Sequence, residues 1–297
     1  MERLRDIDMS GHLSISPIER LCVEAVGADA ATYLHSQLSN DIQSLPVGQS
    51  RYSFVLDPSG KIVALVRVSR LRDDAFFLDT DSVSGLSDVL LARLNKFKIR
   101  VDVNFTATTR SGVAIRSLND RPISESTREV LAGSSDLVVE AWWCDGRAID
   151  VLPVADGEVL DVGRIGADID ASGDSSESFD EARVRTGWPA MGSEILPGET
   201  LVAATGLAGI AVNFSKGCYP GQELVERMDS RGSSAPRTLR RIGTDELHDA
   251  IGHPIRAGES IVIDGSDVGT VTSIAGEWAL ALVSRQIELG DLVSPRN

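Results

Sequence analysis

The sequence predicts an α+β protein of antiparallel strands and helices, followed by a smaller all-β region. Three observations support this fold class. A Pro- and Gly-containing turn at residues 57–60 separates two strand-like runs, as in a β-hairpin. Apolar residues recur at helical spacing in residues 84–95 and alternate with polar residues in 99–105. After residue 237, only strands and turns are expected.

The length and composition are those of an ordinary globular protein with about two or three domains. Of the 297 residues, 42% are hydrophobic and 25% are charged, so a sizeable core is expected without disulfides. We expect a first α+β unit in residues 1–108, a second in 109–236 and a C-terminal β-barrel in 237–297. The formal charge of −15 repels phosphate backbones and anionic membranes, so neither nucleic acid nor membrane is an expected partner.

The cysteines and the N-terminus indicate a cytoplasmic protein. Cys22, Cys144 and Cys218 lie far apart and form no Cys-x-x-Cys pair, which fits a reducing compartment. The first six residues are mostly charged, so no signal peptide is expected. No apolar run approaches the roughly 18 residues that a membrane helix needs.

The first third of the chain predicts a regular order of elements. Residues up to 18 are expected to form an irregular lead-in. Asp29 is expected to cap a helix with Tyr33 and Leu34 on one face. The other expected elements are strands 21–26, 52–56, 62–68 and 75–78, helix 84–95 and strand 99–105.

The rest of the chain partly repeats this order, which suggests a second, similar unit. Its expected elements are strands 112–115, 137–143 and 148–152, a weak helix at 158–165, a loop at 171–178 and a helix at 179–185. A helix at 222–229 follows. The expected C-terminal strands, which suit a small sheet or barrel, are 239–243, 260–264, 268–274, 278–283 and 291–293.

The most unusual stretch is Lys-Gly-Cys-Tyr-Pro-Gly-Gln-Glu at residues 216–223, here called the signature segment. Its Cys218 precedes the expected helix at 222–229, and Lys216 is two residues away. Both features favour a thiolate over a thiol. Gly217 and Gly221 would let the backbone approach a ligand closely. A buried, inert Cys218 is an equally weighted alternative.

Other chemistries have less support. His12, His35, His248 and His253 lie in no recognisable motif, so no base for a cysteine nucleophile is evident and no metal site is expected. Arg227 and Arg231 are four residues apart and would share a helix face. With Lys216 they suit a polyanionic small molecule. The alternative is a solvated face on which Glu223 and Glu226 pair with these arginines.

The signature segment resembles the K-G-C-Y-x-G-Q-E signature of the YgfZ family. These folate-binding proteins are implicated in making or repairing iron–sulfur clusters, and they are related to the aminomethyltransferase, or T-protein, of glycine cleavage. Residues 33–41, 54–62, 94–99 and 227–232 also resemble family segments. The resemblance implies two related α+β units that form a GcvT-like body, and a C-terminal β-barrel, around a central hole that binds tetrahydrofolate.

The resemblance also implies roles for individual residues. Cys218 would be the functional thiol, and Lys216 would keep it reactive. Arg227 and Arg231 would face the anionic tail of the folate. The remaining residues implied at the cofactor site are Tyr219, Gly217, Gly221, Gln222 and Glu223.

Two departures separate this chain from the aminomethyltransferases. Those relatives have an aspartate in the strand after the hairpin, where this chain has Ala64 and Leu65. They also have a glutamate where this chain has Arg185. The absence of these carboxylates weighs against aminomethyl transfer.

We therefore expect a tetrahydrofolate-binding accessory protein for iron–sulfur cluster assembly or repair. Its partners would be folate and, transiently, iron–sulfur proteins or their assembly machinery. One alternative is a folate-dependent one-carbon transferase, and another is a non-catalytic scaffold. Whether the chain is an enzyme stays open, with the accessory role favoured.

Overall fold

The computed structural model describes residues 13–118, 121–133, 136–155, 160–161, 165, 179–230 and 235–294. The chain divides into two units by its internal contacts. The first unit comprises Met1–Glu19 and Arg110–Ala182, and the second comprises Arg20–Thr109 and Arg183–Asn297. The division into three domains expected from the sequence stays a prediction.

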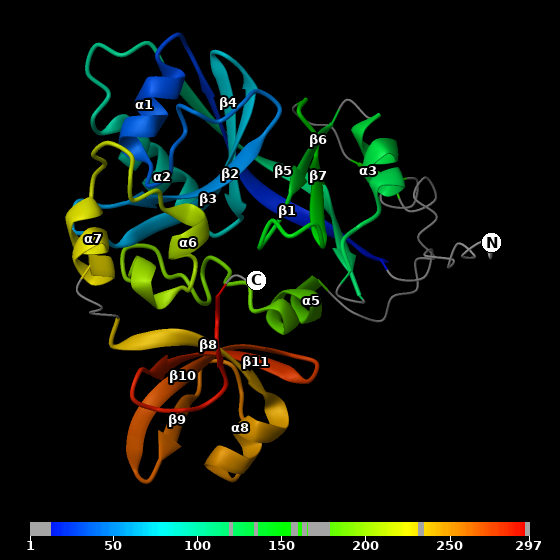
Figure 1. Cartoon of the computed structure of the whole chain (residues 1–297), viewed down its shortest axis with the longest axis vertical. Helices are drawn as coiled ribbons and strands as arrows, with labels where there is room; N and C mark the ends of the chain where they lie inside the picture. The colour runs from blue at the N-terminus through cyan, green and yellow to red at the C-terminus, as the bar shows by residue number, and fades with distance from the viewer. Residues whose placement is uncertain are drawn as a thin grey trace, which may run out of the picture. The chain divides into compact units, whose positions relative to one another are not determined.

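An antiparallel sheet with strand order β2-β3-β4-β1 forms part of the second unit. Its strands are β1 (Leu13–Val26), which starts in the first unit, β2 (Ser50–Leu56), β3 (Ile62–Arg72) and β4 (Ala75–Asp81). Eight consecutive residues of β3 are buried, which explains its nearly continuous apolar run. Helices α1 (Ala30–Gln37) and α2 (Leu86–Asn95) pack against β4 and β3, as Figure 1 shows.

The turn between β2 and β3 forms as the sequence predicts. The Asp57 side chain accepts hydrogen bonds from the backbone N–H groups of Ser59 and Lys61, at 2.8 and 3.0 Å. Gly60 has a φ of +85°, a conformation that costs other residues steric strain. The predicted hairpin is therefore confirmed.

The first unit contains three antiparallel strands in the order β5-β7-β6. They are β5 (Asn104–Ser117), which starts in the second unit, β6 (Leu137–Glu140) and β7 (Ala148–Leu152). Helix α3 (Glu125–Ala132) begins after Ser124, whose hydroxyl accepts a hydrogen bond from Thr127 N. An apolar core joins this helix to the strands through Leu131, Val113 and Val151.

The C-terminal part of the second unit is a five-stranded antiparallel sheet with one helix. Its strand order is β12-β8-β11-β10-β9. The elements are β8 (Arg237–Gly243), α8 (Thr244–Ile251), β9 (Ser260–Ile263), β10 (Ser266–Ala275), β11 (Trp278–Ser284) and β12 (Asp291–Leu292). The predicted C-terminal strands are thus confirmed, while closure of the sheet into a barrel stays a prediction.

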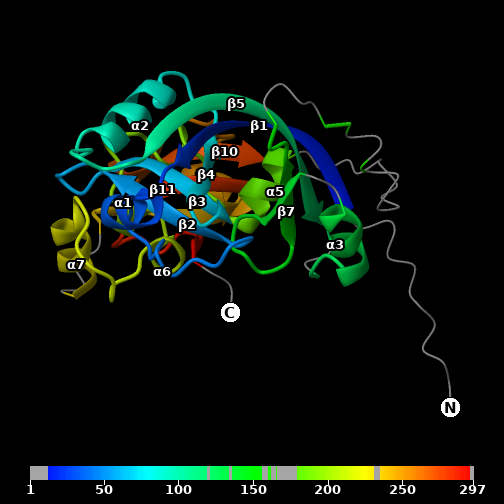
Figure 2. The same cartoon turned by 90° about the horizontal axis from the view of Figure 1, so that it is seen from above.

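Short helices connect the two sheets of the second unit. They are α5 (Phe179–Thr186), which starts in the first unit, the 3₁₀-helix η1 (Val202–Ala204), α6 (Ala208–Ala211) and α7 (Gln222–Ser230). The predicted helices at 179–185 and 222–229 are confirmed as α5 and α7. In Figures 1 and 2, α7 lies at the end of the β2–β3 hairpin.

Four predictions about elements are wrong. Residues 13–18 belong to β1 rather than to a lead-in. Residues 99–103 are not a strand: Arg100 has a φ of +56° and Ile99 is 76% exposed, so the apolar–polar alternation there belongs to a loop. Residues 141–143 turn away from β6, with Trp142 at a φ of +53°. Helix α8 lies where only strands and turns were expected.

Helix α8 escaped the sequence analysis because it is only two turns long. Its apolar residues Leu247, Ala250 and Ile251 do recur at helical spacing, but they span little more than one turn. The predicted loop at 171–178 lies outside the described residues, and so does most of the weak helix at 158–165.

Candidate functional site

The signature segment packs backbone to backbone against the β2–β3 hairpin. Gly221 has a φ of +85°, and a Cβ atom added there would lie 2.5 Å from Asp57 O and 3.0 Å from Gly60 Cα. A Cβ atom on Gly60 would lie 2.7 Å from Leu224 Cβ of α7. Gly221 is therefore needed for packing against the hairpin, a reason that differs from the predicted approach to a ligand. Gly217 is exposed and would meet nothing within 4 Å.

Gln222, the first residue of α7, ties the turn to the cysteine. Its Oε1 accepts a hydrogen bond from Tyr219 N at 2.9 Å. Its Nε2 donates to Cys218 Sγ at 3.7 Å. Cys218 is exposed and unpaired, so the alternative of a buried cysteine is wrong. The structure thus presents a thiol at the start of a helix, as the sequence indicated.

Lys216 points inward rather than toward a ligand. Its Nζ donates hydrogen bonds to His35 O and, at 2.6 Å, to Leu38 O, at the C-terminal end of α1. Burial lowers the pKa of Lys216 to about 8, while the negative charges of Asp41 and Cys218 act in the opposite direction. The ammonium therefore caps α1, where the helix dipole favours a cation.

Residues 39–41 position the chain that enters the signature segment. Asn40 Nδ2 donates to Tyr52 O and to Ile210 O, each at 2.8 Å. Ser39 Oγ donates to Ala211 O at 2.6 Å. These contacts give a structural role to Ser39 and Asn40, which lie in the segment 33–41 that resembles the family.

His35 and Asp41 form a polar pair beside Lys216. His35 Nδ1 lies 3.0 Å from Asp41 Oδ1. Burial and the positive charge of Lys216 lower the pKa of His35, against the opposing effect of Asp41. His35 is therefore close to the signature segment, although no motif in the sequence indicated it.

Arg93 is a further buried cation that the sequence analysis missed. Its side chain is 6% exposed, with Nε donating to Leu56 O at 2.6 Å and Nη1 donating to Gln37 Oε1 at 3.1 Å. Burial lowers its pKa. Arg93 joins α2 to α1 and to the end of β2. It was missed because it lies inside a helical stripe that apolar residues such as Leu90 and Leu94 define.

Tyr219 is buried at 7% exposure, and Lys216 Nζ lies 5.0 Å from the centre of its ring. Burial raises the pKa of Tyr219 to about 12, and the negative charge of Glu226 adds to this effect. Among the described residues, its hydroxyl has no hydrogen-bond partner.

Glu223 and Arg227 face solvent on α7. They form an i, i+4 ion pair of 2.5 Å, in which the carboxylate side chain is 87% exposed. This geometry matches the solvated face that was the alternative for these residues. Arg231 lies outside the described residues.

The positions that lack the expected acids are part of the scaffold. Ala64 and Leu65 are buried in β3, and Leu65 N donates to Met191 Sδ at 3.3 Å. The carbonyl of Arg185 in α5 accepts a hydrogen bond from Arg241 Nη1 at 2.7 Å.

Two other carboxylates are buried in the same unit. Asp79 accepts hydrogen bonds from Arg67 Nη2 at 2.9 Å and from Arg20 Nε at 3.0 Å. Glu194 accepts from Arg183 Nη1 at 2.9 Å. Burial alone would raise the pKa of Glu194, but Arg183 and the surrounding hydrogen bonds outweigh it and lower the pKa. Both acids therefore already have partners within the protein.

The signature residues fit a folate only in part. The unpartnered Tyr219 hydroxyl and the exposed Arg227 offer one buried polar atom and one cation to a ligand. Gly221, by contrast, packs against the β2–β3 hairpin, and the side-chain amide of Gln222 is hydrogen-bonded within the signature segment. Folate contact by the predicted residues thus stays a prediction.

Within the described ranges, no group of three His, Cys, Asp or Glu residues is arranged to hold a metal ion. No described helix is both long enough and apolar enough to cross a membrane.

Comparisons with known proteins identify relatives of the chain. Residues 13–116 match the GCVT N-terminal domain family. A tRNA-modifying protein YgfZ of Edwardsiella ictaluri is 28% identical over 227 residues, which is 72% of this chain and 66% of the relative. The corresponding protein of an Enterobacter species is 26% identical over 70% of this chain and 65% of the relative. An uncharacterized Haemophilus influenzae protein is 25% identical over 76% of this chain and 71% of its own length.

These matches span about two thirds of the curated relatives. Among solved structures, the glycine cleavage aminomethyltransferase T of Bartonella henselae superposes with a TM-score of 0.69. It is 19% identical, and the superposition covers 92% of this chain and 79% of that protein. The predicted resemblance is therefore confirmed: the chain carries a GCVT N-terminal domain, has a GcvT-like fold and is homologous to tRNA-modifying proteins YgfZ.

Proposed function

We propose that this chain is a cytoplasmic, tetrahydrofolate-binding accessory protein for iron–sulfur cluster assembly or repair, acting through Cys218. One observation carries the proposal: an exposed thiol is held by Gln222 at the start of α7. Helix N-termini favour negatively charged groups, and the thiolate is the form of cysteine that attacks disulfides and binds metals.

The surroundings of Cys218 favour an accessory thiol over a hydrolytic nucleophile. Nucleophilic cysteines of that kind pair with a general base, usually a histidine. Among the described contacts, the partner of Cys218 Sγ is the Gln222 amide. Lys216, the nearby cation, is hydrogen-bonded to backbone carbonyls of α1 and stabilises the fold around the thiol. We therefore propose that Lys216 positions the signature segment, in place of the catalytic role predicted from the sequence.

The relatives support a role linked to folate and to tRNA modification. Two of the curated relatives are named tRNA-modifying proteins, and the solved relative is a glycine cleavage aminomethyltransferase. We assign tRNA modification to this chain only indirectly, through the maintenance of iron–sulfur enzymes. The absence of acids at Ala64, Leu65 and Arg185 favours this role over aminomethyl transfer.

Complementation of a strain that lacks the protein tests the role of the thiol. Cys218→Ala should fold but fail to restore iron–sulfur enzyme activity. Cys144→Ser, a change at the other exposed cysteine, should restore it. Full rescue by Cys218→Ala at equal protein levels would refute the thiol role.

Titration with tetrahydrofolate, followed by thermal unfolding, tests the cofactor. A ligand that binds the native state raises the unfolding temperature. The wild type should show such a rise, and Arg227→Ala should show a smaller one. Absence of a rise in both proteins would remove folate from the proposal. Formation of methylene-tetrahydrofolate from a methylamine donor would instead favour the transferase.

A further inference from the structure

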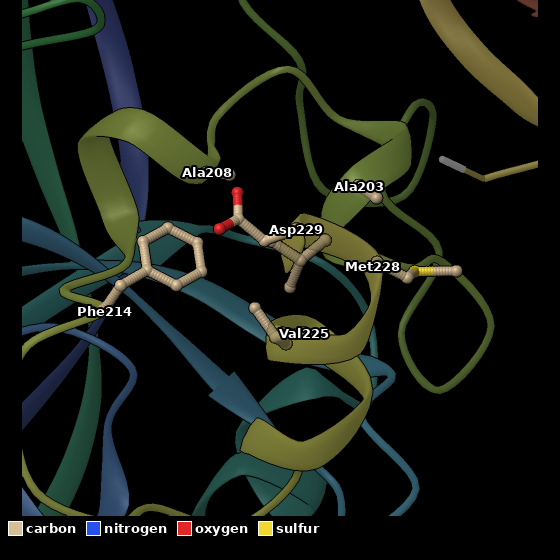
Figure 3. Close-up of a pocket in the computed structure, with 7 residues that line it drawn as sticks. Ala203, Ala208, Phe214, Val225, Met228 and Asp229 are labelled. Carbon is tan, nitrogen blue, oxygen red and sulfur yellow. The ribbon is translucent and has the colours of Figure 1, made fainter. Parts of the chain in front are cut away.

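An apolar pocket of about 220 Å³ lies beside α7, and neither Cys218 nor Arg227 is among the residues that line it. It is built by η1, α6, the segment around Phe214 and one face of α7. Figure 3 shows the side chains that surround it. They are Val202, Ala203, Ala208, Phe214, Val225, Met228 and Asp229.

Asp229 is the charged residue among these lining side chains. It is exposed, and no hydrogen bond or ion pair joins it to another described residue. Figure 3 shows its carboxylate directed into the same space as the Phe214 ring. An acid beside an apolar wall suits a ligand with both a cationic and an apolar part.

The position of Asp229 in α7 strengthens the preference for a cation. Asp229 lies in the last turn of the helix, where the macrodipole is negative and an acidic side chain is unfavourable. A bound cation would compensate both charges. The −15 charge of the chain also attracts cations toward its surface.

The apolar side chains around the pocket limit the size and chemistry of the rest of the ligand. Phe214 is 42% exposed, so its ring face is available to a cation or to an apolar group. A cavity of about 150 Å³ is enough to hold benzene. The space beside α7 therefore admits one aromatic ring with a short aminoalkyl group.

We propose that this pocket binds a small primary amine in its protonated form, with the ammonium on Asp229 and its aromatic or alkyl body against Phe214, Val225 and Met228. The proposal is independent of Cys218 and of folate. It assigns a separate small-molecule site to the chain.

The test uses benzylammonium as the probe and the methionine methyl groups as reporters. The chain has four methionines, so labelled methyl signals are few, and Met228→Leu assigns the pocket signal. Benzylammonium should shift the Met228 signal saturably and leave Met191, which is buried elsewhere, unchanged. Benzyl alcohol, a neutral molecule of the same shape, should bind at least about tenfold more weakly, because it lacks the charged hydrogen bond.

Two variants decide whether Asp229 provides this selectivity. Asp229→Asn should bind benzylammonium and benzyl alcohol with similar affinity. Asp245→Asn, which removes an exposed acid on α8, should leave the preference unchanged. Phe214→Leu should weaken both probes. Equal binding of the two probes to the wild type would overturn the proposal, and so would a Met228 signal that benzylammonium does not move.

Discussion

The inner and outer sides of the signature segment and α7 differ in their contacts. On the inner side, Lys216 binds α1, and Gly221 abuts the β2–β3 hairpin. On the outer side, Cys218 and the Glu223–Arg227 pair are exposed. A motif that looks uniform in the sequence thus contains one set of residues fixed by packing and another accessible to partners. Substitutions should affect stability on the inner side and function on the outer side.

The largest effect should come from Gly221→Ala. The new Cβ atom would collide with Asp57 O in a backbone region that disfavours side chains, so we expect a loss of about 3 kcal/mol or more. Urea unfolding of the purified protein measures this loss. Gly217→Ala should cost less than about 1 kcal/mol, since nothing lies nearby. Similar losses for the two variants would contradict the division into two sides.

Lys216→Met should have the next largest effect. It removes the donor to His35 O and Leu38 O, and unsatisfied carbonyls at a helix end are costly. We expect a loss of about 1–3 kcal/mol in the free energy of unfolding. If Lys216 instead faced a ligand, the same variant would retain the wild-type stability and lose only binding.

The pH dependence of stability offers a separate test of Lys216. Its pKa in the folded state is about 8, below the 10.5 of an unperturbed lysine. Between these values the unfolded chain binds more protons, so the contribution of Lys216 to stability should increase as the pH rises from about 8 toward 10.5. Comparison of urea midpoints across this range should give a flatter profile for Lys216→Met than for the wild type. Parallel stability profiles for the two proteins would show that the amine of Lys216 does not cause the pH dependence.

The smallest effects on stability should lie on the outer side. Glu223→Gln breaks an exposed i, i+4 pair and should cost about 0.5 kcal/mol or less. Cys218→Ser should be equally mild, yet it should abolish complementation. Thermal unfolding measures the first effect, and the strain assay measures the second. A large loss of stability in Cys218→Ser would show that Cys218 belongs to the inner side, where residues are fixed by packing.

Local signals were sufficient for several elements. The turn at 57–60 and the start of α7 at Gln222 follow from side-chain and backbone preferences that act over a few residues. The sequence could not show that β1 begins at Leu13 or that β5 runs unbroken from Asn104 to Ser117. Strand bounds of this kind depend on pairing with distant residues, as Leu21 with Thr80 illustrates.

The candidate site shows the same division. The sequence by itself indicated where the candidate site lies, because Cys218, its glycines and the start of α7 are contiguous. Tertiary structure alone decided that Lys216 caps a helix 178 positions away, that Arg93 lies buried behind the hairpin, and that Asp229 faces an apolar pocket. The physical reason is that charge and side-chain type are properties of a residue, whereas burial and hydrogen-bond partners depend on how the chain folds.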